Sequence, residues 1–267
     1  MAIDLNAGDT AWVLVSAALV LLMTPAVALF YGGMVRAKSV LNMMMMSFLG
    51  LGIVAVLWVA FGYSLAFGDG GNGLIGDFSL AGLMPLVGQV ATNGGAYPIP
   101  ALIFAMFQLM FAVITVALIT GGVADRMKFL AWGIFAAVWA CLVYFPVAHW
   151  VFDFGDDELG GAGAGWLANL GVLDFAGGTA VHINAGAAAL ALVLVLGPRV
   201  GFGRVPMKPH SLPLVVLGAG LLFFGWFGFN AGSALGANQL AAVAFTNTMV
   251  ATAGGVIGWL LVERLRD

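Results

Sequence analysis

Seven long apolar segments, separated by shorter polar connections, run along the 267-residue chain. A helix needs about 20 apolar residues to cross the hydrocarbon core of a bilayer, and each segment reaches that length. The predicted spans cover residues 11–33, 40–67, 98–121, 127–150, 175–197, 212–232 and 239–262. We therefore predict an all-α integral membrane protein, a helical bundle that forms a single membrane domain over residues 1–267. Pro25 and Pro146 fall inside the first and fourth spans, where we expect local kinks.

The charged residues divide the connections into two alternating classes. Every Lys and Arg follows the first, third, fifth or seventh span: Arg36, Lys38, Arg126, Lys128, Arg199, Arg204, Lys208, Arg264 and Arg266. The other connections carry only acidic charges: Asp69, Asp77, Asp153, Asp156, Asp157 and Glu158. By the positive-inside rule, this pattern predicts a cytoplasmic-membrane protein with its N-terminus outside and its C-terminus inside. We expect the two Gly-rich outer connections, 68–97 and 151–173, to be solvated.

Composition excludes several classes of protein. Hydrophobic residues make up 63% of the chain and charged residues 8%, whereas soluble domains carry about 25% charge. Basic residues do not cluster as nucleic-acid binding requires, and the single cysteine, Cys141, cannot form a disulfide within one chain. A nucleophile–base–carboxylate set, a phosphate-binding loop and clustered metal ligands are missing from the sequence. We therefore expect a non-enzyme that has no metal, no other cofactor and no nucleic-acid partner.

Two ionisable residues stand in or beside the fifth apolar segment. Asp174 and His182 are eight positions apart, so a regular helix would carry His182 about 12 Å deeper, close to the bilayer midplane. An ionisable residue at that depth is a candidate functional residue. The alternative for His182 is a structural histidine hydrogen-bonded between helices. Asp174 is expected to cap the fifth helix at the amides of Ala176 or Gly177.

Aromatic and polar residues gather in three other places. The third span carries Phe107, Gln108 and Phe111 on one side, and the sixth ends with Gly225-Trp-Phe-Gly-Phe-Asn-Ala-Gly-Ser233. The fourth ends with His149-Trp-Val-Phe152. Aromatic residues near a membrane surface are most often interfacial anchors. Rings that converge with a hydroxyl on a deep imidazole would instead suit a small cation. His149 and His210 are expected to be solvated or interfacial.

The stretch Asp174-Phe-Ala-Gly-Gly-Thr-Ala-Val-His-Ile-Asn-Ala-Gly186 resembles the signature of the ammonium transporter (Amt/MEP/Rh) family, in its Amt branch. Gly8-Asp-Thr-Ala-Trp12, Leu29-Phe-Tyr-Gly-Gly33 and the aromatic groups described above resemble it too. The resemblance implies a homotrimer whose subunits each have a pore, built from about eleven helices in two inverted repeats. On that plan, residues 11–197 form the first five-helix repeat. Residues 212–262 form the first two helices of an incomplete second repeat.

The resemblance also implies roles for individual residues at the outer end. Phe111 and Ser233 would border the site that recruits ammonium, with Asp174 supporting it structurally and not touching the substrate. The family has a further aromatic residue there, after the fourth span. Phe152 matches that position best, and Trp150 is the alternative.

Deeper in the pore, Phe111 and Phe229 would form a stacked aromatic gate. The remaining residues expected along the pore are His182, Trp226, Phe107 and Gln108. The implied function is ammonium/ammonia transport: ammonium is recruited outside and deprotonated, and ammonia passes a hydrophobic, histidine-lined pore. The implied partners are ammonium or ammonia and the lipid bilayer.

The sequence stops at Asp267, just after the seventh span. By the family plan, the remaining helices, a second pore histidine and a cytoplasmic tail would follow. A nitrogen-signalling regulatory protein is an expected partner of such a full-length form. A lone copy of residues 1–267 should leave the His182 face of the pore exposed to lipid, which is costly. Two alternatives to transport are therefore an ammonium sensor or receptor, and a transport-inactive fragment.

Overall fold

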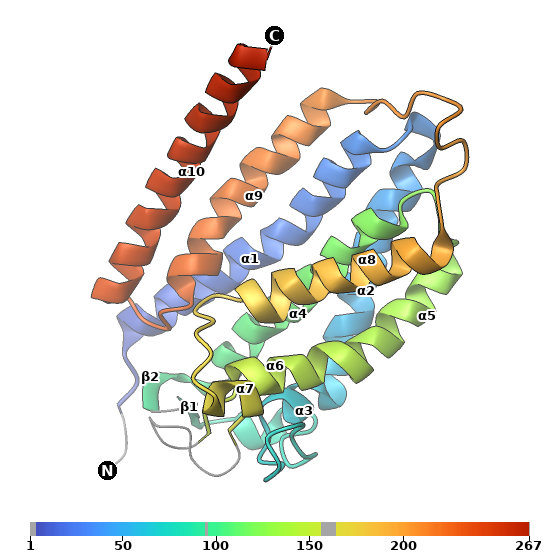
Figure 1. Cartoon of the computed structure of the whole chain (residues 1–267). Helices are drawn as coiled ribbons and strands as arrows, with labels where there is room; N and C mark the ends of the chain where they lie inside the picture. The colour runs from blue at the N-terminus through green and yellow to red at the C-terminus, as the bar shows by residue number, and fades with distance from the viewer. Residues whose placement is uncertain (1–3, 94–95, 156–163, 267) are drawn as a thin grey trace.

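The computed structural model describes residues 4–93, 96–155 and 164–266. The predicted outer charges Asp156, Asp157 and Glu158 lie outside these ranges. The described chain forms a bundle of long helices, with its N- and C-termini at opposite ends (Figure 1). Seven of its helical segments are long and apolar enough to cross a membrane: Ala7–Met34, Ala37–Phe67, Ala101–Val123, Phe129–Phe152, Gly178–Leu196, Leu212–Gly232 and Gln239–Arg266.

Four spans are continuous helices and three contain a π-helical turn. The continuous ones are α1 (Ala7–Met34), α4 (Ala101–Val123), α9 (Leu212–Gly232) and α10 (Gln239–Arg266). The second span consists of α2 (Val40–Leu57), a π-turn (Trp58–Gly62) and α3 (Tyr63–Phe67). The fourth consists of α5 (Phe129–Trp139), a π-turn (Ala140–Tyr144) and α6 (Phe145–Phe152). The fifth begins with a π-turn (Gly178–Ile183) and continues as α8 (Asn184–Leu196). Shorter elements are α7 (Trp166–Asn169), β1 (Val90–Thr92), β2 (Ala96–Pro100) and 3-10 turns at Ala37–Ser39 and Met84–Leu86.

The seven predicted spans are confirmed, and their ends differ little from the observed ones. The largest differences, four residues each, are at Ala7 for the predicted start at 11 and at Arg266 for the predicted end at 262. Pro25 lies inside the continuous helix α1, and Pro146 is the second residue of α6, just after the π-turn of the fourth span. The local kinks expected at these two residues stay predictions.

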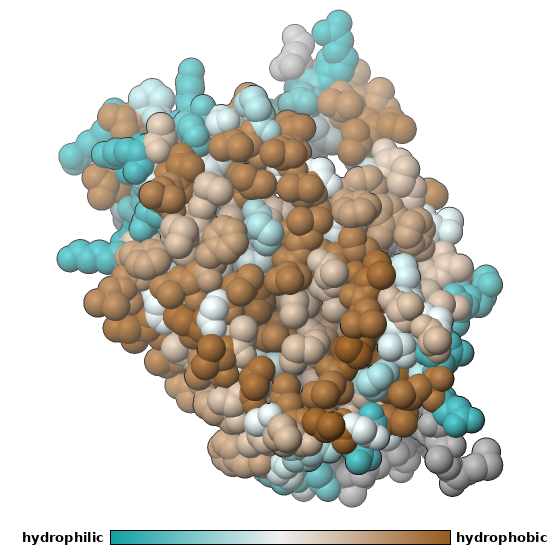
Figure 2. All heavy atoms as spheres, turned by 180° about the vertical axis from the view of Figure 1, so that it is seen from behind, coloured by the Kyte–Doolittle hydropathy of each residue, from teal (hydrophilic) through white to brown (hydrophobic). Residues whose placement is uncertain are grey.

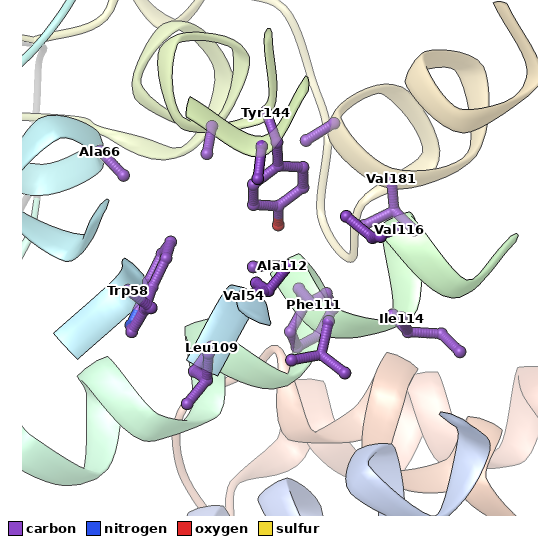
Figure 3. Packing of buried hydrophobic residues seen from close by; sticks show 14 of the residues in the cluster. Val54, Trp58, Ala66, Leu109, Phe111, Ala112, Ile114, Val116, Tyr144 and Val181 are labelled. Atoms are coloured by element: carbon purple, nitrogen blue, oxygen red, sulfur yellow. The ribbon is translucent and has the colours of Figure 1, made fainter. Parts of the chain in front are cut away.

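Helix α4 is the centre of the bundle. In its most apolar 18-residue window 67% of the residues are buried, against 11% in α10. Figure 3 shows Trp58, Tyr144 and Val181, which come from three different spans, gathered around the part of α4 that carries Phe111 and Ala112. The indole Nε1 of Trp58 donates a hydrogen bond to the Ala105 carbonyl of α4 at 3.0 Å. This bond satisfies a polar group that would otherwise be costly in an apolar core.

Helices α1 and α9 approach each other through a row of glycines on α9, which we call the glycine face: Gly218, Gly225, Gly228 and Gly232. A Cβ atom at Gly218 would lie 2.5 Å from the backbone nitrogen of Phe30. One at Gly228 would lie 2.6 Å from Cβ of Leu19 and 2.8 Å from the Ser16 carbonyl oxygen. Small residues allow membrane helices to pack backbone against backbone. The glycine face therefore sets the separation of α1 and α9.

Basic connections meet at one end of the bundle. Arg36 Nε lies 3.1 Å from Asp125 Oδ2, which joins the connections after the first and third spans. Arg126 Nε donates to the Gly197 carbonyl at 2.9 Å, which joins those after the third and fifth. The alternation of charge along the sequence thus corresponds to a grouping in space.

The connections at the other end are partly packed against the helices, while many of their described residues are exposed. The prediction that they are solvated is therefore met only in part. Leu86 and Ala91 are buried in the main hydrophobic core. The amide of Trp166 donates to the Gly73 carbonyl at 2.9 Å, which ties the two connections together. Strands β1 and β2 pair in an antiparallel ladder within the first of them. This ladder gives backbone groups of the two strands partners within the protein.

The outer surface of the helices is apolar. Figure 2 shows a broad hydrophobic area across one face of the molecule, with hydrophilic residues toward its margins. The last two spans contribute strongly to exposed apolar surface, because only 22% of the most apolar window of α9 and 11% of that of α10 are buried. Such a surface is suited to lipid or to further helices and not to water.

The glycine face gives a stability prediction. Replacing Gly228 with Leu should lower the free energy of unfolding by about 1–3 kcal/mol, because the new side chain must displace Leu19 and the backbone of α1. The measurement is the unfolding free energy in mixed detergent micelles. Gly220→Leu is the matched control, since a Cβ at Gly220 meets no atom within 4 Å. Equal losses in both variants would contradict close packing as the cause.

Candidate functional site

Asp174 holds the start of the fifth span. Its Oδ1 accepts the amides of Gly177 and Gly178 at 2.7 and 2.8 Å. Its Oδ2 accepts those of Thr179 and Ala180 at 2.8 and 3.0 Å. These are donors that a helix N-terminus otherwise leaves without partners. The predicted capping role is confirmed: Gly177 is one of the amides, Ala176 is not, and three further amides join it.

Gly177 occupies a backbone conformation that requires glycine. Its φ of +102° lies in the left-handed region, and a Cβ there would come within 2.9 Å of Val181 Cγ2 and 3.5 Å of Phe111 Cδ1. The turn before the fifth helix can therefore lie directly against α4. This contact brings the carbonyl of Gly177 toward His182.

His182 lies within the π-turn and not in a regular helix. Its backbone amide donates to the Gly177 carbonyl at 3.2 Å, and its ring Nδ1 lies 3.3 Å from the same oxygen. Because a carbonyl only accepts, a neutral ring in this arrangement carries its hydrogen on Nδ1 and leaves Nε2 as an acceptor. Asp174 precedes the helix instead of starting it, so the regular-helix estimate of depth, about 12 Å, does not apply.

Two aromatic rings of α9 contact His182, and one of them connects it to the rings of α4. Its ring stacks on that of Trp226, with centroids 5.7 Å apart and planes at 25°. The edge of Phe229 meets it at 5.6 Å. Phe229 in turn contacts Phe111 at 4.5 Å, and Phe111 contacts Phe107 at 4.9 Å. The planes of Phe111 and Phe229 are tilted by 42°, so the expected stacked pair is close but not parallel.

Phe152 is the aromatic residue after the fourth span that reaches these rings. Its centroid lies 6.5 Å from that of Phe111. Trp150 instead packs on Trp166 at 5.7 Å and donates its indole N–H to the Leu74 carbonyl at 2.6 Å. Trp150, the alternative that the sequence left open, therefore packs against the outer connections.

Gln108 precedes Phe111 by three residues on α4. The i, i+4 neighbour Phe107 contacts Phe111, whereas Gln108 is half-buried and forms no hydrogen bond within the described part of the chain. The spacing keeps Gln108 on the same side of α4 as Phe111, and its place along the pore stays a prediction.

Ser233 ends α9 close to the cluster. Its hydroxyl donates to the carbonyl of Phe229 at 2.8 Å. Two residues near the start of α1 hold the region. Asp9 accepts a hydrogen bond from the amide of Ala237 at 2.7 Å, and the indole of Trp12 donates to the carbonyl of Ala231 at 3.2 Å. The sequence singled out Asp9 and Trp12 only through the family resemblance. In the sequence itself, the sign of their role was an acidic residue and a tryptophan at the beginning of the first apolar segment.

His149 is fully buried, so the prediction that it is solvated or interfacial is wrong. Its Nδ1 lies 3.1 Å from both the Ala66 carbonyl and Asp153 Oδ2. Helix α3 covers the end of α6, and the local sequence gave no sign of that contact. His210 is exposed, as expected, with Nδ1 3.0 Å from the Val35 carbonyl.

A cavity of about 560 Å³ lies between His182 and the end of the bundle that carries the basic connections. Helix α8 contributes Ala185 and Gly186 to its lining. The polar lining includes the side chains of Arg126 and Arg199. The rings therefore separate the outer end of the molecule from an inner cavity that His182 lines.

Comparison with known proteins decides the family. The model of the Ammonium Transporter Family matches residues 11–267. This chain belongs to the ammonium transporter family. The sequence resemblance is thereby confirmed.

The chain is similar to ammonium transporters along almost its entire length. It is 56% identical over 276 residues to the ammonium transporter of Mycobacterium tuberculosis, covering 98% of this chain and 57% of the relative. The crystal structure of Candida albicans Mep2 matches it with a TM-score of 0.83 at 35% identity, covering 98% of this chain and 56% of that one. A structure titled Sensor Amt Protein matches with a TM-score of 0.84 at 28% identity, covering 96% and 62%. The chain thus spans less than two thirds of the length of these transporter-family relatives.

The four hydrogen bonds accepted by Asp174 lead to a prediction about the stability of this ammonium transporter family member. Asp174→Ala should lower the free energy of unfolding by about 1.5–3 kcal/mol or more, since buried amides lose a charged acceptor. Asp174→Asn, which retains one acceptor oxygen, should lose less. Unfolding in mixed micelles measures both, and an unchanged stability of Asp174→Ala would show that the four bonds contribute nothing.

Proposed function

We propose that the complete protein containing this chain transports ammonium nitrogen across the cytoplasmic membrane. In this proposal ammonium is recruited and deprotonated at the outer end, and ammonia passes along His182. The observation that carries it is the unbroken series of ring contacts from Phe152 through Phe111 and Phe229 to His182, above a cavity that His182 also lines.

Recruitment would rest on Phe111, Phe152 and the hydroxyl of Ser233. A cation loses several kcal/mol on leaving water without a partner. Desolvated contact with aromatic faces returns about 2 kcal/mol or more. Asp174 acts as support here, because both carboxylate oxygens are already engaged by backbone amides.

The Phe111–Phe229 pair would act as the gate. Rings with centroids 4.5 Å apart leave no room for a hydrated cation between them. Transient separation of the rings would admit a neutral molecule the size of ammonia far more readily than a charged one, because the charged form pays for desolvation. The proton therefore leaves ammonium on the outer side of this pair.

His182 would receive ammonia beyond the gate. Trp226 stacks on the imidazole and Gly177 accepts from Nδ1, so the ring orientation is fixed from two sides. The free Nε2 can accept an N–H of ammonia or relay a proton. Trp226 and Phe107 add apolar lining; Gln108, half-buried on α4, is the remaining pore residue of the proposal.

The arrangement in the membrane belongs to the same proposal. The end with the basic connections faces the cytoplasm by the positive-inside rule, which places the N-terminus outside and the C-terminus inside. Residues 11–197 form one five-helix repeat and 212–262 begin the second, inverted one. The exposed apolar faces of α9 and α10 suit lipid, further helices or the neighbouring subunits of a homotrimer. A nitrogen-signalling protein would bind on the cytoplasmic side.

An ammonium sensor is the second candidate. The similarity to the Sensor Amt Protein favours it, because the same scaffold is present in a protein of that title. Binding of ammonium without flux would identify a sensor. Proteoliposomes containing residues 1–267 alone, compared with the complete protein, separate a transport-competent chain from an inactive fragment by their ammonium-driven currents.

His182 gives the decisive test of transport. In the complete protein, His182→Ala should abolish the ammonium-driven current in proteoliposomes, because the inner half of the path loses its only predicted proton acceptor within the described residues. Ile183→Ala is the matched control, since that neighbouring side chain is 65% exposed on the outer surface of the bundle. Undiminished current in His182→Ala would remove the imidazole from the mechanism.

A further inference from the structure

The inner cavity is positively charged at its mouth. Its lining is apolar apart from a few groups, and the fully charged side chains among the described lining residues are Arg126 and Arg199. No carboxylate is among those lining residues. An ion that reaches His182 through this cavity therefore comes under the charge of two guanidinium groups.

The charges of the two arginines are held in place without being neutralised. Arg126 donates from Nε to the Gly197 carbonyl at 2.9 Å and from Nη1 to the Gly122 carbonyl at 3.1 Å. Carbonyls orient a guanidinium and leave its net charge unchanged. Nε of Arg199 is buried and has no hydrogen-bond acceptor in the described part of the chain.

The nearby carboxylate is engaged elsewhere. Asp125 accepts from Arg36 Nε at 3.1 Å and from the Ser39 hydroxyl at 2.5 Å. Burial opposes ionisation of Asp125, but these two hydrogen bonds and the nearby arginines lower its pKa, so it remains charged and bound to Arg36. For Arg126, burial and then repulsion from Arg199 lower the pKa against the opposing pull of Asp125. The net charge in the region of Arg126 and Arg199 is therefore positive.

We propose that Arg126 and Arg199 form a cationic collar that excludes cations from the inner cavity. Cytoplasmic ammonium then does not reach His182, and the species that occupies the inner half of the path is uncharged ammonia. The collar makes the path harder to enter for a cation from inside than from outside, where aromatic faces attract one. This inference rests on the proposed transport function and adds a specificity determinant to it.

A cysteine probe measures the collar directly. In the complete protein with Cys141→Ser, Gly186→Cys places a thiol in the cavity, where a Cβ meets no atom within 4 Å. Thiosulfonate reagents that carry a sulfonate or a trimethylammonium group are applied to the cytoplasmic side of inside-out vesicles. The anionic reagent should react faster than the cationic one by about tenfold, relative to the same pair on a free thiol. The ratio cancels changes in thiolate fraction, which affect both reagents equally.

Charge variants separate the collar from a merely structural role. Arg199→Gln should reduce the rate ratio several-fold toward the free-thiol value, and Arg199→Lys should restore it. Arg204→Gln, an exposed residue of the same connection that does not line the cavity, should leave it unchanged. Arg199 is a better position to substitute than Arg126, because the Arg126 side chain forms two hydrogen bonds to backbone carbonyls that help to hold the fold.

Two results would overturn the collar: a rate ratio equal to that of a free thiol in the parent, or an unchanged ratio in Arg199→Gln. Measurements of the ammonium-driven current provide an independent test of the collar. Arg199→Gln should lower the cytoplasmic ammonium concentration that gives half-maximal current several-fold and leave the outer value unaltered. Absence of any ammonium current in the parent would contradict the proposed function, whereas the thiol ratios decide the collar by themselves.

Discussion

The close approach of α1 and α9 is the constraint on which the site depends. The glycine face of α9 lies against α1, and the same helix carries Trp226 and Phe229 toward His182. A side chain at Gly228 would push α9 outward and take both rings with it. The start of α1 also holds the end of α9 through Trp12 and the connection that follows α9 through Asp9. Absence of side chains on one face of a helix thus determines where aromatic side chains lie on another.

A second requirement is that backbone groups inside a membrane find partners. The turn before the fifth span departs from helical geometry at Gly177, which would expose several amides. Asp174 accepts four of them, and one buried carboxylate therefore makes an irregular turn possible against α4. The carbonyl of Gly177 is then available to both the amide and the ring of His182. The turn that Asp174 stabilises is therefore also the turn that orients the imidazole of His182.

The sequence was sufficient for features that depend on local pattern. Span positions follow from apolar length, and the grouping of basic connections follows from charge alternation, so both could be predicted. The capping role of Asp174 is likewise a short-range effect. Contacts between Phe111, Phe229 and His182 were anticipated only through the family resemblance, because nothing in periodicity brings residues from three spans together.

The predictions that failed involve partners distant in the sequence. His149 looked interfacial at the end of its span, yet its ring meets the carbonyl of Ala66, 83 positions away. The choice between Trp150 and Phe152 depended on how the outer connections fold over the helices, and those connections were expected to be solvated. The π-turns have the same character, since tertiary packing and not residue preference decides where a helix takes up an additional residue.

The π-turn at Gly178–Ile183 makes the length of that hexapeptide as important as its chemistry. Each residue of a regular helix advances the side-chain direction by about 100°. Deleting a single residue there would restore ordinary helical bonding and rotate all of α8 relative to Asp174. Ala185 and Gly186 would then turn away from their present positions along the inner cavity. Change in this part of the chain is therefore restricted to substitution, because a shift in register would misdirect an entire helix.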